Sequence, residues 1–167
     1  KKSNIDIYAS AGSIQSNLTD LKKDTDKALK MGIDRIKIRL NTSQNYTKKI
    51  NFLEKNINSF AIDLIANTFD KNKNKNNLNK FLNFIRRKKV LWIEEVLNVD
   101  DLNYFSNLNK FKKLSFSYGE NFTSFIDFSH LFKIKNIKYI NLDITHCTIS
   151  DLKKLIHYMK HNNIKKK

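Results

Sequence analysis

The feature that most constrains the fold is a repeated alternation between two hydrophobic periods. Short apolar runs with the alternating pattern of strands are each followed by a segment with helical spacing. The predicted strands lie at 5–10, 35–40, 60–68, 90–97, 113–119 and 137–145, and the predicted helices at 18–32, 46–57, 76–88, 99–108, 124–134 and 148–162. Helical crossovers between successive strands make those strands parallel. We therefore predict an α/β fold with about six parallel strand-helix units.

Two architectures satisfy this alternation, a barrel and an open doubly wound sheet, and the hydrophobic period alone does not choose between them. The connection after the first strand argues against a nucleotide site. The stretch "YASAGSIQS" lacks the glycine spacing that dinucleotide-binding and P-loop sites require.

The chain is strongly basic, with 32 Lys and Arg against 16 Asp and Glu and a formal net charge of +16. Such a charge attracts phosphate backbones or acidic membranes if it is concentrated on one face. Lysines are instead interspersed with asparagines, as in "KNKNKNNLNK", which favours charge spread over solvated surfaces. A functional polyanion-binding surface stays open as an alternative.

Cysteine and hydrophobic content indicate the compartment. Cys147 is the only cysteine, so an internal disulfide and a cysteine-rich metal site are both excluded. No signal peptide opens the sequence, and no apolar run approaches the roughly 18 residues that a membrane helix needs. We expect a cytoplasmic protein without a membrane partner.

Charged side chains share faces within the predicted strands, because residues two apart on a strand point the same way. Lys37 and Arg39 share one face of the second strand. In "VLWIEEVL", Glu94 shares a face with Trp92, whereas Glu95 lies on the opposite face.

Further polar residues occur at the ends of later strands. Glu120 follows the fifth strand, and Asn141 and Asp143 share one face of the sixth. Each could be a helix N-cap or a solvated loop residue. However, α/β folds place their sites at the carboxyl ends of parallel strands, and buried charges need partners. A cluster of cations and carboxylates there predicts a divalent metal with an anionic substrate.

Five stretches resemble, in order, motifs of the enolase superfamily, within its mandelate racemase, muconate lactonizing enzyme and acid-sugar dehydratase branch. They are "KALKMGIDRIKIRL", "DLIANTFD", "LWIEEVLNVDDL", "YGEN" and "INLDITHCTISDLKKL". The resemblance implies a partial TIM-type (β/α) barrel that lacks the last two strands and the capping domain. Residues 1–167 would then be a single incomplete barrel domain.

The resemblance also implies a chemistry. The family abstracts the proton next to a substrate carboxylate and stabilises the resulting enediolate with Mg²⁺, as in dehydratases and racemases. By position it implies metal ligation by Glu94 and Glu120, catalytic roles for Lys37, Arg39 and Asp143, and substrate binding by Lys37, Asn67 and Asn141. Asp143 matches an aspartate that orients a histidine base, and the implied substrate is a carboxylate-bearing sugar acid.

The sequence departs from the family pattern at the first metal ligand, where Ile65 stands just before Ala66-Asn67. Asp63 lies roughly 6.6 Å back along the strand, which we expect to be too far to replace that ligand unless the strand slips. Arg39 is a poor proton acceptor, because a guanidinium holds its proton far more tightly than a catalytic base does. His146 is expected to be a loop residue rather than the base. We therefore expect a weakened Mg²⁺ site in a fragment or degenerate member with impaired catalysis.

Two other functions stay open. One is a non-catalytic basic module that binds nucleic acid or another polyanion through Lys, Arg and exposed aromatic rings. Nucleic acid is disfavoured because most aromatics lie at helical core spacing, which burial explains better: Phe81, Phe84, Phe125 and Phe128. The other is a structural role in an oligomer, because an open barrel exposes two parallel strand edges.

Overall fold

Strands and helices alternate along the part of the chain that the computed structural model describes, which comprises residues 7–13, 15–41, 46–65, 75–96, 108–132 and 134–162. In chain order they are β1 (Ala9–Ala11), α1 (Leu18–Lys30), β2 (Arg35–Arg39), α2 (Tyr46–Asn56), β3 (Ser59–Asp63), α3 (Lys75–Ile85), β4 (Val90–Glu94), β5 (Phe116–Tyr118), α5 (Phe125–Leu131), β6 (Ile137–Ile140) and α6 (Ile149–His161). These elements confirm the predicted alternation, although most strands are shorter than predicted. The helix predicted at 99–108 falls almost wholly outside the described residues.

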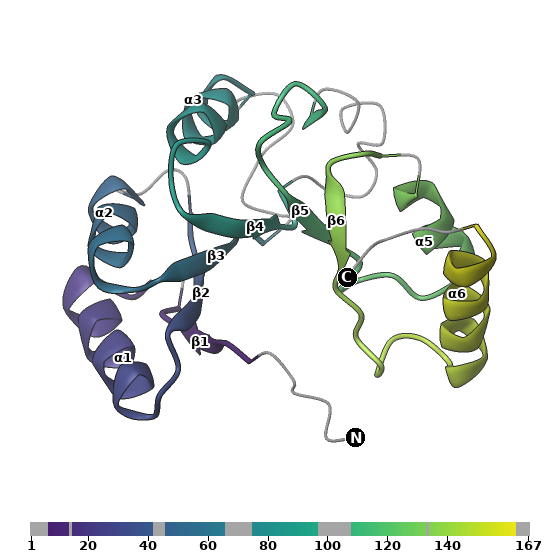
Figure 1. The fold of residues 1–167 in the computed structure, drawn as a ribbon, viewed down its shortest axis with the longest axis horizontal. Coiled ribbons are helices and arrows are strands. Elements are labelled where there is room, and N and C mark those ends of the chain that lie inside the picture. The colour runs from purple at the N-terminus through teal and green to yellow at the C-terminus, as the bar shows by residue number, and fades with distance from the viewer. Residues whose placement is uncertain are drawn as a thin grey trace.

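The strands form one sheet of six in the order β1-β2-β3-β4-β5-β6, and every neighbouring pair is parallel. A doubly wound sheet would reverse its strand order at a switch point, whereas a barrel adds strands in one direction. The architecture is therefore that of a partial TIM-type barrel. Figure 1 shows the sheet curving into an open arc with the helices along its convex side.

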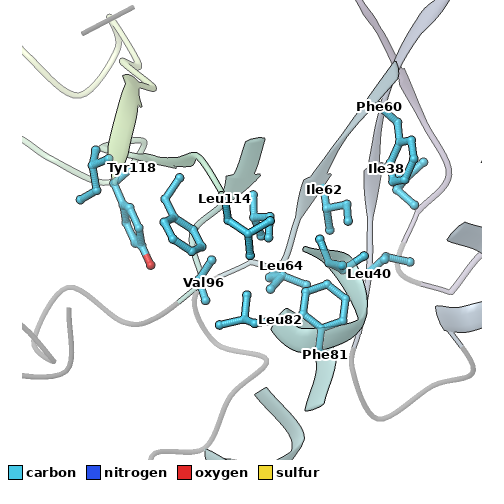
Figure 2. Close-up of a cluster of buried hydrophobic side chains, with 14 of the residues drawn as sticks. Ile38, Leu40, Phe60, Ile62, Leu64, Phe81, Leu82, Val96, Leu114 and Tyr118 are labelled. Carbon is cyan, nitrogen blue, oxygen red and sulfur yellow. The ribbon is translucent and has the colours of Figure 1, made fainter. Parts of the chain in front are cut away.

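The core lies between the convex face of the sheet and the helices. Alternate residues of β2 and β3 are apolar and point toward that layer, as a half-buried strand requires. Phe81 and Leu82 on α3 pack against them (Figure 2). Burial of each large apolar side chain contributes about 1.5–3 kcal/mol. The members of this cluster on the two strands or directly after them, all 1% exposed or less, are Ile36, Ile38, Leu40, Phe60, Ile62 and Leu64.

The helix starts are fixed by side-chain caps. The Asn17 side chain accepts a hydrogen bond from the backbone N–H of Asp20 at 3.0 Å, and the Asp20 carboxylate accepts one from the N–H of Asn17 at 3.2 Å. At the start of α6, Thr148 Oγ1 accepts from the N–H of Asp151 at 3.1 Å. Such caps satisfy donors that have no partner inside the helix, so they fix where α1 and α6 begin.

The register between β3 and β4 shifts by one residue. Phe60 is opposite Val90, but Ile62 is opposite Ile93, so one extra residue of β4 is accommodated between these pairs. Beyond the shift, Asp63 lies directly opposite Glu94. This irregularity places the two acidic residues side by side at the carboxyl end of the sheet.

Among the described residues, no helix has the length and apolar character needed to cross a membrane. All the described strands belong to one sheet. That residues 1–167 form a single domain stays a prediction.

Candidate metal centre

Three carboxylates from the ends of consecutive strands meet on the concave side of the sheet. One oxygen from each of Asp63, Glu94 and Glu120 lies within 4.8 Å of the other two. Asp63 and Glu94 are each 1% exposed, and Glu120 is partly exposed. We call these three residues the acid cluster. The structure thus brings Glu94 and Glu120 together as the sequence predicted, and adds Asp63.

The expectation that Asp63 lies too far along its strand is wrong. The register shift places it opposite Glu94, so no slippage of β3 is needed. Ile65 helps to hold the Asp63 carboxylate in place, because its backbone N–H donates to Asp63 Oδ1 at 3.0 Å. The family motif placed the ligand just before Ala66-Asn67, two residues beyond Asp63, and those two residues lie outside the described part of the chain. The sequence signal for Asp63 as a candidate ligand was its position as a lone acidic residue in the apolar run "SFAIDLI".

Lys37 on β2 supplies the nearest cation to the acid cluster. Its ammonium donates to both Glu94 oxygens, at 3.0 and 3.1 Å, and lies 4.0 Å from Asp63 Oδ2. Burial alone would lower the pKa of Lys37, but the attraction of Glu94 and the hydrogen bond to it outweigh burial, so the pKa is raised. Lys37 therefore stays an ammonium at neutral pH.

Arg39, two residues further along β2, is held more loosely. Its Nε donates to Asp63 Oδ2 at 3.2 Å, while 49% of its side chain is exposed. Solvent screens an ion pair of this kind, which typically contributes less than about 1 kcal/mol. Lys37 and Arg39 share the concave face, as their spacing predicted.

Glu94 is fixed by two further donors. Asn141 Nδ2 donates to its Oε1 at 2.6 Å, and Trp92 Nε1 donates to its Oε2 at 3.3 Å. Burial raises the pKa of Glu94, and attraction by Lys37 only partly opposes this. Asn141, which the resemblance assigned to substrate binding, is here a hydrogen-bond partner of the acid cluster.

Aromatic rings lie beside the acid cluster. The ring centres of Tyr8 and Trp92 are 5.5 Å apart, and those of Trp92 and Tyr139 are 4.9 Å apart. Lys37 Nζ lies 5.7 Å from the centre of the Tyr8 ring. Apolar walls strengthen electrostatic attraction inside a site. Sequence reasoning missed Tyr8 and Tyr139, although Tyr139 shares a strand face with Asn141.

Glu95 directly follows the last residue of β4 and is 2% exposed. Its Oε1 accepts hydrogen bonds from the backbone N–H groups of Gly119, at 3.0 Å, and Glu120, at 3.4 Å. Its Oε2 has no hydrogen-bond partner among the described residues, and burial raises the pKa of Glu95 to about 7. Glu95 thereby ties the end of β4 to the backbone that carries Glu120, a role that sequence reasoning missed.

Gly119 allows β5 and β6 to approach each other closely just before Glu120. Its φ is +123°, in a region that residues with a Cβ rarely adopt. A Cβ here would lie 2.7 Å from the carbonyl oxygen of Asn141 and 2.8 Å from the Phe128 ring. Only glycine fits this position without displacing its neighbours.

Asp143 is not part of the acid cluster, contrary to the expectation that it converges with Glu94 and Glu120. Its Oδ1 instead accepts from the Thr145 hydroxyl at 2.7 Å and N–H at 2.8 Å, and these bonds lower its pKa. These hydrogen bonds within the turn, rather than the alternation of side chains along the strand, set the direction of the Asp143 carboxylate. Its role as partner of a base stays a prediction, as does the role of Asn67, which lies outside the described residues.

His146 lies in an exposed turn, where its Nδ1 is 3.0 Å from the carbonyl oxygen of Glu120. This agrees with its expected place in a loop. The contact adds a second link, besides Glu95, between the backbone of Glu120 and a neighbouring strand end.

The acid cluster fits a small divalent cation. Mg²⁺ takes oxygen ligands at about 2.1 Å, so ligands on opposite sides of it are roughly 4.2 Å apart. Neighbouring ligands of an octahedral ion lie closer, roughly 3.0 Å apart, so the three carboxylate oxygens, all within 4.8 Å of one another, would move closer together to hold the ion. Three carboxylates opposed by Lys37 and Arg39 also leave one negative charge for a cation to neutralise.

Solved structures share this fold. The chain superposes on L-talarate dehydratase from Polaromonas sp. JS666, complexed with Mg and L-glucarate, with a TM-score of 0.74, 17% identity and coverage of 94% of this chain and 45% of that one. It superposes on a racemase from Streptomyces coelicolor A3(2) with bound magnesium with a TM-score of 0.75 and 18% identity, covering 94% of this chain and 48% of that one. It superposes on 3,6-anhydro-D-galactonate cycloisomerase from Zobellia galactanivorans with a TM-score of 0.77 and 17% identity, covering 94% of this chain and 44% of that one.

The chain spans less than half the length of these three proteins, and at such identities the likeness shows the fold alone. No curated protein sequence matches it significantly. A family model is more specific, because the one described as enolase C-terminal domain-like matches residues 20–165. The chain therefore belongs to the enolase C-terminal domain-like family.

Proposed function

We propose that the chain is the barrel segment of a Mg²⁺-dependent enzyme that removes the proton next to the carboxylate of a sugar acid, as a dehydratase or racemase. The acid cluster is the observation that carries this proposal. Two proteins of the same fold support it, a dehydratase complexed with Mg and L-glucarate and a racemase with bound magnesium. The activity is that of the complete protein, because the chain spans only part of the length of such proteins.

Asp63, Glu94 and Glu120 would hold the metal. When bound, Mg²⁺ supplies a positive charge that polarises the substrate carboxylate and stabilises the negative charge left when the proton departs. Glu95 and Asn141 would keep two of the ligands in place, since Glu95 accepts from the N–H of Glu120 and Asn141 donates to Glu94. Burial beside aromatic rings makes these interactions stronger than they would be in water.

Lys37 would bind the substrate carboxylate. Its ammonium stays protonated because its pKa is raised, so it contributes charge rather than accepting a proton. Arg39, whose guanidinium donates to Asp63, would act electrostatically. Since neither cation suits the role of base, we expect the proton acceptor to come from another group of the complete protein, with Asp143 as the predicted partner that orients it.

Two further proposals concern the setting of the protein. A cytoplasmic location fits the single cysteine, Cys147, which has no disulfide. An oligomeric or completed barrel fits the sheet, because β1 and β6 each pair on only one side within the described residues.

Calorimetric titration with Mg²⁺ tests the metal site. The wild-type chain should bind one Mg²⁺ more tightly than millimolar, and Glu94→Gln should abolish the binding heat. Glu54→Gln is the matched control, because Glu54 pairs with Lys88 on another face and is not in the acid cluster. Absence of binding to the wild type, or equal binding by Glu94→Gln, would overturn the proposal.

A further inference from the structure

A second candidate site lies at the opposite ends of the strands. A cavity of about 450 Å³ is lined by Arg86, Arg87, Lys110, Phe111, Lys112 and Lys113. The two arginines precede β4, and the other residues precede β5. Since these strands are parallel, the cavity is at their amino ends, whereas the acid cluster is at their carboxyl ends. We call it the basic cavity.

The basic cavity concentrates positive charge that its surroundings do not neutralise. Five of its six lining residues are cations, and none of the described residues that line it is acidic. Nearby Glu54 already pairs with Lys88 at 2.6 Å. Within the described part of the chain, the five cations make no ion pair or side-chain hydrogen bond. Such a site favours a multiply charged anion.

The backbone beneath these cations is anchored in the core. Leu108 and Leu114 flank the lysine segment and are 1% and 5% exposed. The carbonyl of Leu108 accepts from the N–H of Phe111 at 2.9 Å and from Asn136 Nδ2 at 2.8 Å, and the carbonyl of Phe111 accepts from the N–H of Leu114 at 2.8 Å. The charges therefore extend from a fixed frame, which reduces the cost of ordering them around a ligand.

The size and lining of the basic cavity indicate its ligand. A volume of this order suits a small molecule, since ligand pockets range over roughly 300–1,000 Å³. Arginine forks match phosphate oxygens, and lysines add charge around them. Phe111 is only 9% exposed, so it offers no surface on which a nucleic acid base could stack. The lining therefore favours a compact anion over a nucleic acid strand.

We propose that the basic cavity binds a small molecule that carries two or more linked phosphate groups. This site is independent of the acid cluster and would be present whether or not the chain binds Mg²⁺. Inorganic tripolyphosphate is a suitable probe, because it carries this chemistry and nothing else.

Calorimetric titration with tripolyphosphate, without divalent cations, tests the proposal on the whole chain. The wild type should bind one molecule, and Arg86→Gln with Arg87→Gln should weaken binding by at least about tenfold, since hydrogen bonds to charged groups contribute strongly. Lys23→Gln with Lys30→Gln is the control of equal charge loss, on the exposed face of α1, and should change affinity little. Glu94→Gln should bind as the wild type does.

Circular dichroism melting curves identify any variant that fails to fold, and the pair Lys110→Gln with Lys112→Gln then repeats the test from the other wall of the cavity. Equal weakening by the α1 control pair would overturn the proposal, because binding would then follow net charge. Binding of a single-stranded RNA oligonucleotide in preference to tripolyphosphate, with similar losses in every lysine variant, would overturn it in favour of a diffuse nucleic acid surface.

Discussion

The ammonium of Lys37 lies 3.0 and 3.1 Å from the two carboxylate oxygens of Glu94, so one cation contacts both oxygens of a candidate metal ligand. Both side chains are nearly buried, at 11% and 2% exposed. Buried charges are stable only while paired. Lys37 therefore stabilises the acid cluster in the metal-free protein and competes with a metal for Glu94.

Lys37→Met should destabilise the metal-free protein and strengthen its dependence on Mg²⁺. Removing one partner of a buried ion pair typically costs about 3–5 kcal/mol, because the remaining charge is left without compensation. Urea unfolding in the presence of a chelator should show this loss. Saturating Mg²⁺ should restore more stability to Lys37→Met than to the wild type, since the metal then supplies the missing charge.

Arg39→Gln is the matched control for that experiment. Arg39 also contacts the acid cluster, but nearly half of its side chain is exposed, so its loss should cost less than about 1 kcal/mol. If the two variants lost equal stability, burial would not be what distinguishes these cations.

The stability of the protein should fall as the pH rises toward neutrality, because of Glu95. Its pKa is about 7 in the folded protein and near its ordinary 4.5 in the unfolded chain, so the folded state binds more protons between these values. Stability should therefore decrease from pH 4.5 to about 7, by at most about 3 kcal/mol at about 1.4 kcal/mol per pH unit. Urea unfolding as a function of pH measures this decrease.

Glu95→Gln isolates the contribution of this carboxyl. Glutamine keeps an oxygen that can accept from the backbone of Gly119 and Glu120, and it stays neutral at every pH. The variant should match the wild type near pH 4.5 and exceed its stability above pH 7. Burial also raises the pKa of Glu94, so a weaker slope of the same sign should remain. An unchanged slope in Glu95→Gln would show that Glu95 does not titrate in this range.

The sequence predicted the strand-helix alternation because that pattern reflects local burial, which the hydrophobic period records directly. It also predicted that Lys37 shares a face with Arg39 and Glu94 with Trp92, since side chains alternate along a strand. The period left the strand order open between a barrel and a doubly wound sheet; the family resemblance implied the barrel, and the described strands confirm it.

The sequence did not predict which carboxylate completes the acid cluster. That depends on how β3 and β4 are aligned, and the one-residue register shift that places Asp63 opposite Glu94 has no sequence signature in either strand. Similarly, the turn after β6 directs Asp143 toward Thr145, through local hydrogen bonds that compete with the strand period. The alignment of neighbouring strands and the hydrogen bonds of a turn thus decide the positions of Asp63 and Asp143, and the pattern within a single strand does not record either.

Gly119→Ala should destabilise the protein more than Gly32→Ala. Both glycines have positive φ, at +123° and +77°, but a Cβ at Gly32 would meet nothing within 4 Å. At Gly119 it would clash with backbone and ring atoms, so its cost should exceed the about 1–3 kcal/mol of backbone strain alone. Chemical unfolding of both variants separates crowding from strain. Equal losses would show that the close approach of β5 and β6 costs nothing to disturb.

Asn141→Leu and Asn141→Asp should change Mg²⁺ binding in opposite senses. In the wild type, Asn141 Nδ2 donates to Glu94 Oε1 at 2.6 Å, a charge-assisted hydrogen bond of about 1.5–3 kcal/mol. Leucine removes that donor, so Glu94 loses its orientation and Mg²⁺ affinity should fall.

Aspartate places a further negative charge against Glu94, so the metal-free protein should lose stability while Mg²⁺, which neutralises the repulsion, should bind more tightly than to the wild type. Calorimetric titration and urea unfolding with a chelator check the two variants together. Weaker Mg²⁺ binding by both variants would mean that Asn141 acts through its shape, whereas opposite changes would show that its hydrogen bond and the charge of the acid cluster set the metal affinity.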